Sequence, residues 1–113
     1  TNALLPGMSR ERYDVVLSRP SLDEMWKPGK PMSQGYESSA NEWMGLGFFV
    51  LDRGGTRIVG HTGSQAGFRS FYFFNPATKA GVIAVFNTTN EASPATAAQR
   101  RVQEMALSLL SAP

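Results

Sequence analysis

The chain has 113 residues, 42% of them hydrophobic and 18% charged, with a formal net charge of +2. This size and composition predict one globular domain over residues 1–113, and the scattered weak charge argues against a nucleic-acid partner. No apolar run is long enough for a membrane span, which excludes a membrane-spanning helix. With no cysteine and one histidine, disulfides, thiolate chemistry and a structural zinc site are excluded. We expect no metal and no cofactor, and the composition leaves periplasm and cytoplasm equally open.

Residues 1–43 are rich in polar and turn residues, and they predict short helices joined by loops. One helix is expected from Arg10 to Leu17. A second would begin at Ser21, because Ser21-Leu22-Asp23-Glu24 has the capping-box pattern, and would run through Trp26 to end before Pro28-Gly29. The stretch 28–41 predicts a surface loop.

Residues 44–113 change to a strand pattern followed by one helix. Four segments are rich in aromatic and β-branched residues and are bounded by glycine, asparagine, aspartate or proline. They span residues 46–51, 57–62, 68–74 and 82–86. The last is apolar at every position, which predicts a strand covered on both faces.

The closing helix is predicted from Pro94 to about Ser111. Ser93-Pro94 is an N-cap followed by proline at the first helical position. An apolar stripe at helical spacing predicts the face that packs on the sheet. Its members are Ala98, Val102, Met105 and Leu109. The predicted fold is therefore α+β, with a four-stranded antiparallel sheet, this helix on one face and short N-terminal helices.

The segment His61-Thr62-Gly63-Ser64 is the candidate binding site. It follows a predicted strand and opens a loop bounded by Gly63 and Gly67. A ring that can carry positive charge and a hydroxyl can together hold a ligand carboxylate. A glycine beside them lets the backbone come close to the ligand. On spacing alone, an ordinary strand end with a turn glycine is the better explanation of the triplet, and only the order of the surrounding elements favours a binding site.

The order of motifs from residue 43 to 111 resembles the C-terminal part of the penicillin-recognising serine hydrolases: class C β-lactamases, DD-peptidases and related esterases. In that family a Lys-Thr-Gly or His-Thr-Gly strand lies between strands of characteristic sequence. The matching segments are Gly45-Leu46-Gly47-Phe48, His61-Thr62-Gly63, Gly67-Phe68, Asn75-Pro76, the strand from Gly81 to Asn87 and the helix from Pro94 to Leu110.

The resemblance implies a role for each residue of the candidate site. His61 would lend positive charge or a hydrogen bond to a substrate carboxylate, and Thr62 would offer its hydroxyl to the same group. Gly63 would leave room for the substrate to lie along the strand. The backbone amide of Ser64 would be one of two oxyanion-hole donors, so Ser64 contributes its N–H and is not a nucleophile.

The family's nucleophile lies in a Ser-x-x-Lys motif, and this chain has none. The residues three places before Lys27, Lys30 and Lys79 are a glutamate, a lysine and a proline. A second family motif, Tyr-x-Ser, has a formal match at Tyr36-Glu37-Ser38, which is better explained as part of a surface loop. The chain alone is therefore expected to be inactive.

Two functions follow as hypotheses. In the first, the chain is the C-terminal part of such a hydrolase, and an N-terminal segment carrying the nucleophile is its partner. In the second, it is a stand-alone non-catalytic domain that binds or assembles. The family strand matching 82–86 pairs with an N-terminal strand that is absent here. An unpaired apolar strand predicts a homo-oligomer formed through that edge.

Overall fold

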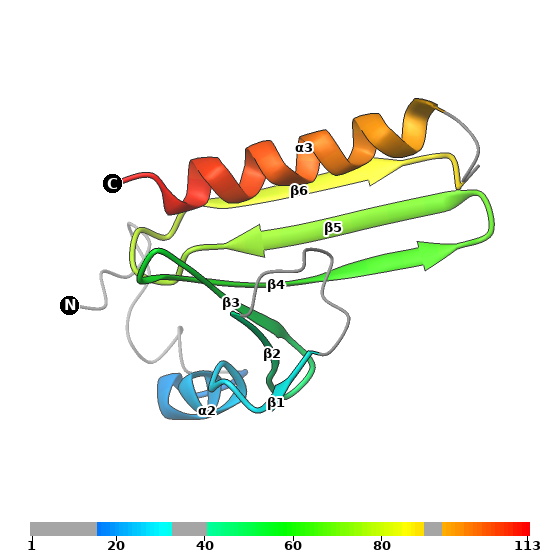
Figure 1. Cartoon of the computed structure of the whole chain (residues 1–113). Coiled ribbons are helices and arrows are strands. Elements are labelled where there is room, and N and C mark those ends of the chain that lie inside the picture. The colour runs from blue at the N-terminus through cyan, green and yellow to red at the C-terminus, as the bar shows by residue number, and fades with distance from the viewer. Residues whose placement is uncertain (1–15, 33–40, 90–93) are drawn as a thin grey trace.

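The computed structural model describes residues 16–32, 41–89 and 94–113. It is an α+β fold in which one long helix lies across an antiparallel sheet (Figure 1). The strands follow one another in space as they do in the chain. The elements are α2 (Arg19–Met25), β1 (Lys30–Pro31), β2 (Glu42–Met44), β3 (Phe49–Arg53), β4 (Thr56–Gln65), β5 (Phe68–Phe74), β6 (Gly81–Phe86) and α3 (Pro94–Ser111).

The sheet has six strands, so the prediction of four was wrong. The additional strands, β1 and β2, are two and three residues long and lie where the sequence predicted only loop and helix. Backbone hydrogen bonds hold them: the Gly29 amide donates to the Met44 carbonyl, and the Met32 amide donates to the Glu42 carbonyl. Segments this short show no alternation of apolar and polar residues, so sequence pattern does not reveal them.

β3 begins three residues later than predicted, because Gly45 to Phe48 form a turn. The Gly45 amide donates to the Phe48 carbonyl at 2.8 Å, and Gly47 has a φ of 75°. A φ in that region favours glycine, which lacks a Cβ. β3 then runs to Arg53, and the turn to β4 consists of Gly54 and Gly55, both with positive φ.

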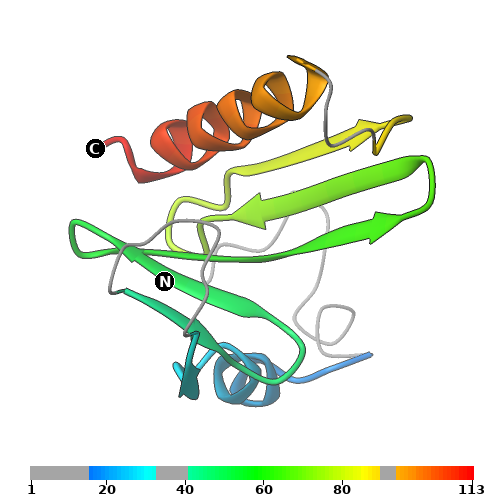
Figure 2. The same ribbon diagram turned by 45° about the vertical axis from the view of Figure 1, so that its right-hand side comes forward.

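β5 has the predicted bounds, and β6 begins one residue early, at Gly81. β4 extends to Gln65 rather than ending at Thr62, so the predicted site lies within a strand and not at its end. β2 and β3 cross the direction of β4–β6 at an angle, as expected of a twisted sheet (Figure 2).

α2 begins earlier than the predicted capping box. Its N-cap is Ser18, whose hydroxyl accepts from the Ser21 amide, and a proline follows in the first turn. Ser21 is thus inside the helix, because the Ser-Arg-Pro sequence before it already provides a cap. Residues 10–15 of the other predicted helix lie outside the described residues, and Val16 and Leu17 are not helical.

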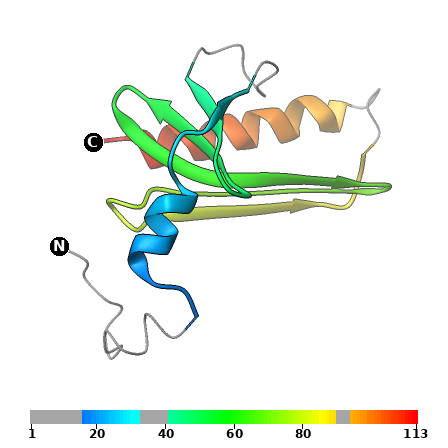
Figure 3. The ribbon, with the colours of Figure 1, turned by 90° about the horizontal axis from the view of Figure 1, so that it is seen from below.

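α2 and α3 lie on opposite sides of β4–β6 (Figure 3). Trp26, which follows α2, is buried and makes edge-on ring contacts with Phe48 and Phe74. Phe74 points away from α3, since its neighbour Phe73 packs in the core beneath that helix. Trp26 is therefore a packing residue on the second face.

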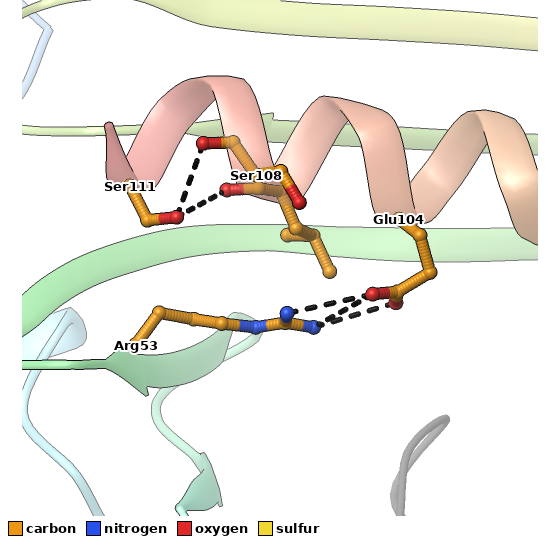
Figure 4. A network of polar contacts seen from close by, with 5 residues as sticks. Arg53, Glu104, Ser108 and Ser111 are labelled. Atoms are coloured by element: carbon orange, nitrogen blue, oxygen red, sulfur yellow. Dashed lines mark hydrogen bonds and ion pairs between the residues drawn. The ribbon is translucent and has the colours of Figure 1, made fainter.

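The core lies between α3 and the sheet, and its buried hydrophobic residues are Leu51, Ile58, Phe71, Phe73, Ala106, Leu107 and Leu110. The predicted stripe on α3 was wrong: Ala98, Val102, Met105 and Leu109 are exposed. The buried face contains Thr96, Gln99 and Gln103 beside the three core residues of the helix. Arg53, which ends β3, pairs with Glu104 of α3 at 3.3 Å (Figure 4).

β6 is the last strand in the order and has no neighbour on its outer side within the described part of the chain. Val82, Ala84 and Phe86 pack against the core. The alternate residues Ile83 and Val85 are 77% and 58% exposed, so the prediction of a strand covered on both faces was wrong. The structure describes no layer over the opposite face of β6.

Candidate active-site strand

His61 to Ser64 lie in the second half of β4. The pairing of β3 with β4 begins at Arg53–Thr56 and ends at Phe49–Gly60. β5 continues beyond that point and pairs with β4 up to Gln65. In the described residues, 61–65 therefore have a strand on one side only, and the hairpin projects past the end of β3 (Figure 1).

The register decides which backbone groups point to the open side. In an antiparallel ladder, residues alternate between pointing their N–H and C=O at the partner strand and pointing them away. The two-residue turn after β4 closes on the Gln65–Phe68 pair, so the odd-numbered residues of this segment face β5. The N–H and C=O groups of Thr62 and Ser64 then face the open edge, in line with those of Gly60, which face β3.

His61 is half-buried and is held by two contacts. Its ring stacks on Phe49, with centroids 4.2 Å apart and planes inclined by 24°. Its Nδ1 lies 2.5 Å from the Thr62 carbonyl oxygen, which faces the open edge. The imidazole therefore lies at the end of β3 that begins with Phe49, beside the part of the β4 backbone that has no partner on this side among the described residues.

Thr62 is also half-buried, but its side chain leaves the opposite face from that of His61, since successive side chains alternate. It lines a small cavity of about 10 Å³ between the sheet and α3. Phe49, Glu42 and Gln103 line the same cavity. The two side chains can meet one ligand only at the open edge, where the two faces join.

Gly63 and Ser64 are exposed. A Cβ at Gly63 would meet the Ser70 hydroxyl at 3.0 Å and no other atom within 4 Å. Ser64 is opposite Arg69 in the register of β4 with β5. A hydrogen bond holds the turn of the β4–β5 hairpin: the hydroxyl of Thr89 accepts from the Gly67 amide at 2.9 Å.

The other described parts of the chain provide weaker candidates for a functional site. Tyr36-Glu37-Ser38 lies outside the described residues. An open depression of about 530 Å³ lies at the other end of the sheet, lined by Arg57, Pro76 and Thr78 among others, and contains no residue of the predicted site. No group of three acidic or histidine side chains within the described ranges could hold a metal ion. None of the helices described here is long and apolar enough to cross a membrane.

Two features of this site were missed from sequence. One is the open edge itself, which exists because β3 starts only at Phe49. The other is the contact of Phe49 with His61. The signal for both was Gly47: a glycine two residues before an aromatic strand marks a turn, and reading it so would have moved the start of β3.

Comparison with known proteins bears on the fold and the family of this chain. The chain is similar in structure to the octameric penicillin-binding protein homologue from Pyrococcus abyssi, with a TM-score of 0.63 and 21% sequence identity. That match covers 86% of this chain and 21% of the other, so the chain spans about a fifth of that protein's length. None of the curated protein sequences matches it. The sequence profile of the beta-lactamase family matches residues 4–107, and the chain therefore belongs to the beta-lactamase family.

Proposed function

We propose that this chain supplies the substrate-binding strand of a β-lactamase-like serine hydrolase site, and that another polypeptide segment supplies the nucleophile. The observation that carries the proposal is the open edge of β4 beside His61-Thr62-Gly63-Ser64. The family's nucleophile motif, Ser-x-x-Lys, is absent from these 113 residues. The contribution of this chain is therefore binding and electrostatic stabilisation.

The open edge suits an acyl substrate in an extended conformation. Such a substrate can pair with the backbone of Ser64 as an added strand would, while the Thr62 carbonyl is already bound by Nδ1 of His61. The Ser64 N–H then donates to the oxygen that becomes negative during acyl transfer, a contact worth about 3 kcal/mol in the transition state. His61 faces the same edge and is placed to meet an acidic group of the substrate.

Binding to the isolated chain tests this proposal. We expect a cephalosporin carboxylate, added to the ¹⁵N-labelled chain, to shift the amide resonances of residues 61–65. The resonances of Arg57 and Thr78, which line the depression at the other end of the sheet, should stay unchanged. Shifts centred on that depression, or no shifts at saturating ligand, would refute the proposed site.

A substitution at Ser64 tests the oxyanion donor. Ser64→Pro removes the N–H, and proline is tolerated at a strand edge whose N–H faces outward. Ser64→Ala keeps the N–H and removes only the hydroxyl. We expect the proline variant to lose the ligand-induced shifts and the alanine variant to keep them. Equal loss in both variants would assign the contact to the hydroxyl.

Catalysis should be missing from the chain alone. We expect no turnover of a chromogenic cephalosporin or a nitrophenyl ester, since no serine here has a lysine three residues after it. A co-purifying chain or a longer reading frame with Ser-x-x-Lys would support the hydrolase. Turnover by the purified chain, free of contaminating enzyme, would point instead to a nucleophile among its own residues.

The second candidate function is a stand-alone domain that binds or assembles, and β6 favours it. The outer edge of β6 is open in the described structure, and Ile83 and Val85 are exposed beside it. The similar Pyrococcus abyssi protein is octameric, which supports assembly as a property to test here. We expect sedimentation at micromolar concentration to show an oligomer, and Val85→Lys to shift it to monomer by placing charge on the edge. A monomeric parent chain would exclude this assembly.

A further inference from the structure

The two contacts of His61 determine which ring nitrogen carries the proton. The Thr62 carbonyl oxygen can only accept a hydrogen bond, so Nδ1, 2.5 Å away, must be the donor. In the neutral ring the other nitrogen, Nε2, then has a lone pair and no hydrogen. The stack on Phe49 opposes a turn of the ring that would exchange the two nitrogens.

Building on the proposed function, we infer that Phe49 is a positioning residue that holds His61 in the Nδ1–H tautomer, so that the site binds an anionic ligand only when His61 is protonated. An ionised carboxylate accepts hydrogen bonds and cannot donate them. When the ring is neutral, the carboxylate would face the lone pair of Nε2 and could form no hydrogen bond with it. Protonation places a hydrogen on Nε2 and a positive charge on the ring, and the proton comes from the solvent.

The open edge of β4 is what makes the Thr62 carbonyl available to His61. Within a fully paired strand, that oxygen would accept from a neighbouring strand, as register places the carbonyl of Gly60 opposite β3. Here β3 has ended, and the imidazole takes the position that a strand N–H would occupy. Because no described strand pairs with β4 at this point, a ligand can approach the edge, and the Thr62 carbonyl can accept a hydrogen bond from His61. The open edge therefore also favours the Nδ1–H tautomer.

The neighbouring strands β2 and β5 carry other groups that titrate or are charged. Tyr72 is opposite His61 in the register, and Arg69 is opposite Ser64. Glu42, on β2, lines the cavity shared by Phe49 and Thr62. Phe49 itself, from β3, is uncharged. Arg69 adds charge that does not depend on pH in the physiological range, so proton uptake on binding is assigned to His61.

The first test uses the free chain and needs no ligand. His61 is the only histidine, so its ring nitrogens are observed without overlap in a ¹⁵N–¹³C correlation spectrum. At a pH where the ring is neutral, we expect Nδ1 to be the protonated nitrogen. Protonation of Nε2 instead would overturn the inference, whatever the chain's function.

Variants of Phe49 separate positioning from folding. Phe49→Leu should give a mixture of the two tautomers, and Phe49→Tyr, which keeps the ring, should restore the Nδ1–H form. Phe68→Leu makes the same chemical change at an exposed position and should leave the spectrum of His61 unchanged. An unchanged tautomer in folded Phe49→Leu would remove Phe49 from the argument and leave the Thr62 carbonyl as the sole cause.

The second test compares a cephalosporin carboxylate with its methyl ester by calorimetry in two buffers of different ionisation enthalpy. At a pH where the free ring is neutral, the acid should bind with net proton uptake. The ester should bind without proton uptake. Binding of the acid without proton uptake would overturn the inference but not the proposed function. If neither compound binds, the proposed function fails, and the tautomer measurement still decides the inference.

Discussion

The two halves of β4 have the same backbone conformation and opposite surroundings. From Thr56 to Gly60 the strand pairs with β3, and Val59 and Gly60 also pair with β5; Ile58, Val59 and Gly60 are buried. From His61 to Gln65 it pairs, among the described residues, with β5 alone, and none of these five residues is buried. The first half anchors the strand, and the second half offers its backbone to a ligand. β4 can do both because β3, its neighbour on one side, is only half as long as β4.

The difference originates in the preceding strand. Gly47, with its positive φ, delays the start of β3 to Phe49, and the Gly54–Gly55 turn sets the register. Together they place the last β3–β4 pair at Gly60, one residue before His61. A turn in one strand thus decides where the binding segment of the next strand begins.

The largest expected difference in stability comes from replacing one glycine by alanine in each half of β4. A Cβ at Gly60 would lie 2.0 Å from the Tyr72 carbonyl oxygen and 2.9 Å from the Phe73 Cα, and neither backbone atom can move without separating β4 from β5. We expect Gly60→Ala to lower the free energy of unfolding by about 3 kcal/mol or more. Gly63→Ala, which meets only the rotatable Ser70 hydroxyl, should cost less than about 1 kcal/mol. Urea denaturation measures both, and equal losses would show that the two halves are packed alike.

The same contrast should extend to α3, which covers the paired half with one side and exposes the other. Leu107 is 1% exposed and Leu109 is 70% exposed. Leu107→Ala should lower the free energy of unfolding by about 3 kcal/mol, and Leu109→Ala by no more than about 0.5 kcal/mol. A large loss at Leu109, growing with protein concentration, would mean that the outer stripe is buried in an assembly.

Hydrogen exchange compares the backbone of the two halves directly. The amides of Ile58 and Gly60 face β3, and those of Thr62 and Ser64 face the open edge. We expect the first pair to exchange at least about a hundredfold more slowly, because their hydrogen bonds break only when the sheet opens. Strong protection of Thr62 and Ser64 in the free chain would show that another strand covers the edge.

The smallest expected effect concerns the ion pair that ties the hairpin of the paired half to α3. Arg53 and Glu104 are partly exposed, so solvent screens the pair. Glu104→Gln should lower the free energy of unfolding by about 0.5 kcal/mol, and added salt should reduce the difference. Glu24→Gln, at an exposed pair on α2, is the control and should change stability even less. A loss above about 2 kcal/mol at Glu104 would make the pair a main support of the hairpin.

Much of the molecule could be predicted from local sequence. The aromatic and β-branched composition of residues 68–74 and the bounding turn at Asn75 give β5 its observed limits. α3 begins at the predicted Pro94, and the predicted N-cap Ser93 lies outside the described residues. The sequence also placed His61 and Thr62 at the end of a strand before Gly67, although the strand in fact continues to Gln65. These features depend on interactions between residues that are close in the sequence, so they can be predicted from the sequence.

Other features depended on contacts between distant segments. β1 and β2 are too short to have a pattern of their own, and they exist because each pairs with a neighbour. α3 has apolar residues on two sides, and packing against the sheet buries Leu107 and leaves Met105 exposed. The open edge of β4 is likewise a difference in length between two strands. The sequence alone determined the longer strands and α3. Tertiary structure decided which of their sides are covered, because covering a side requires a partner from elsewhere in the chain.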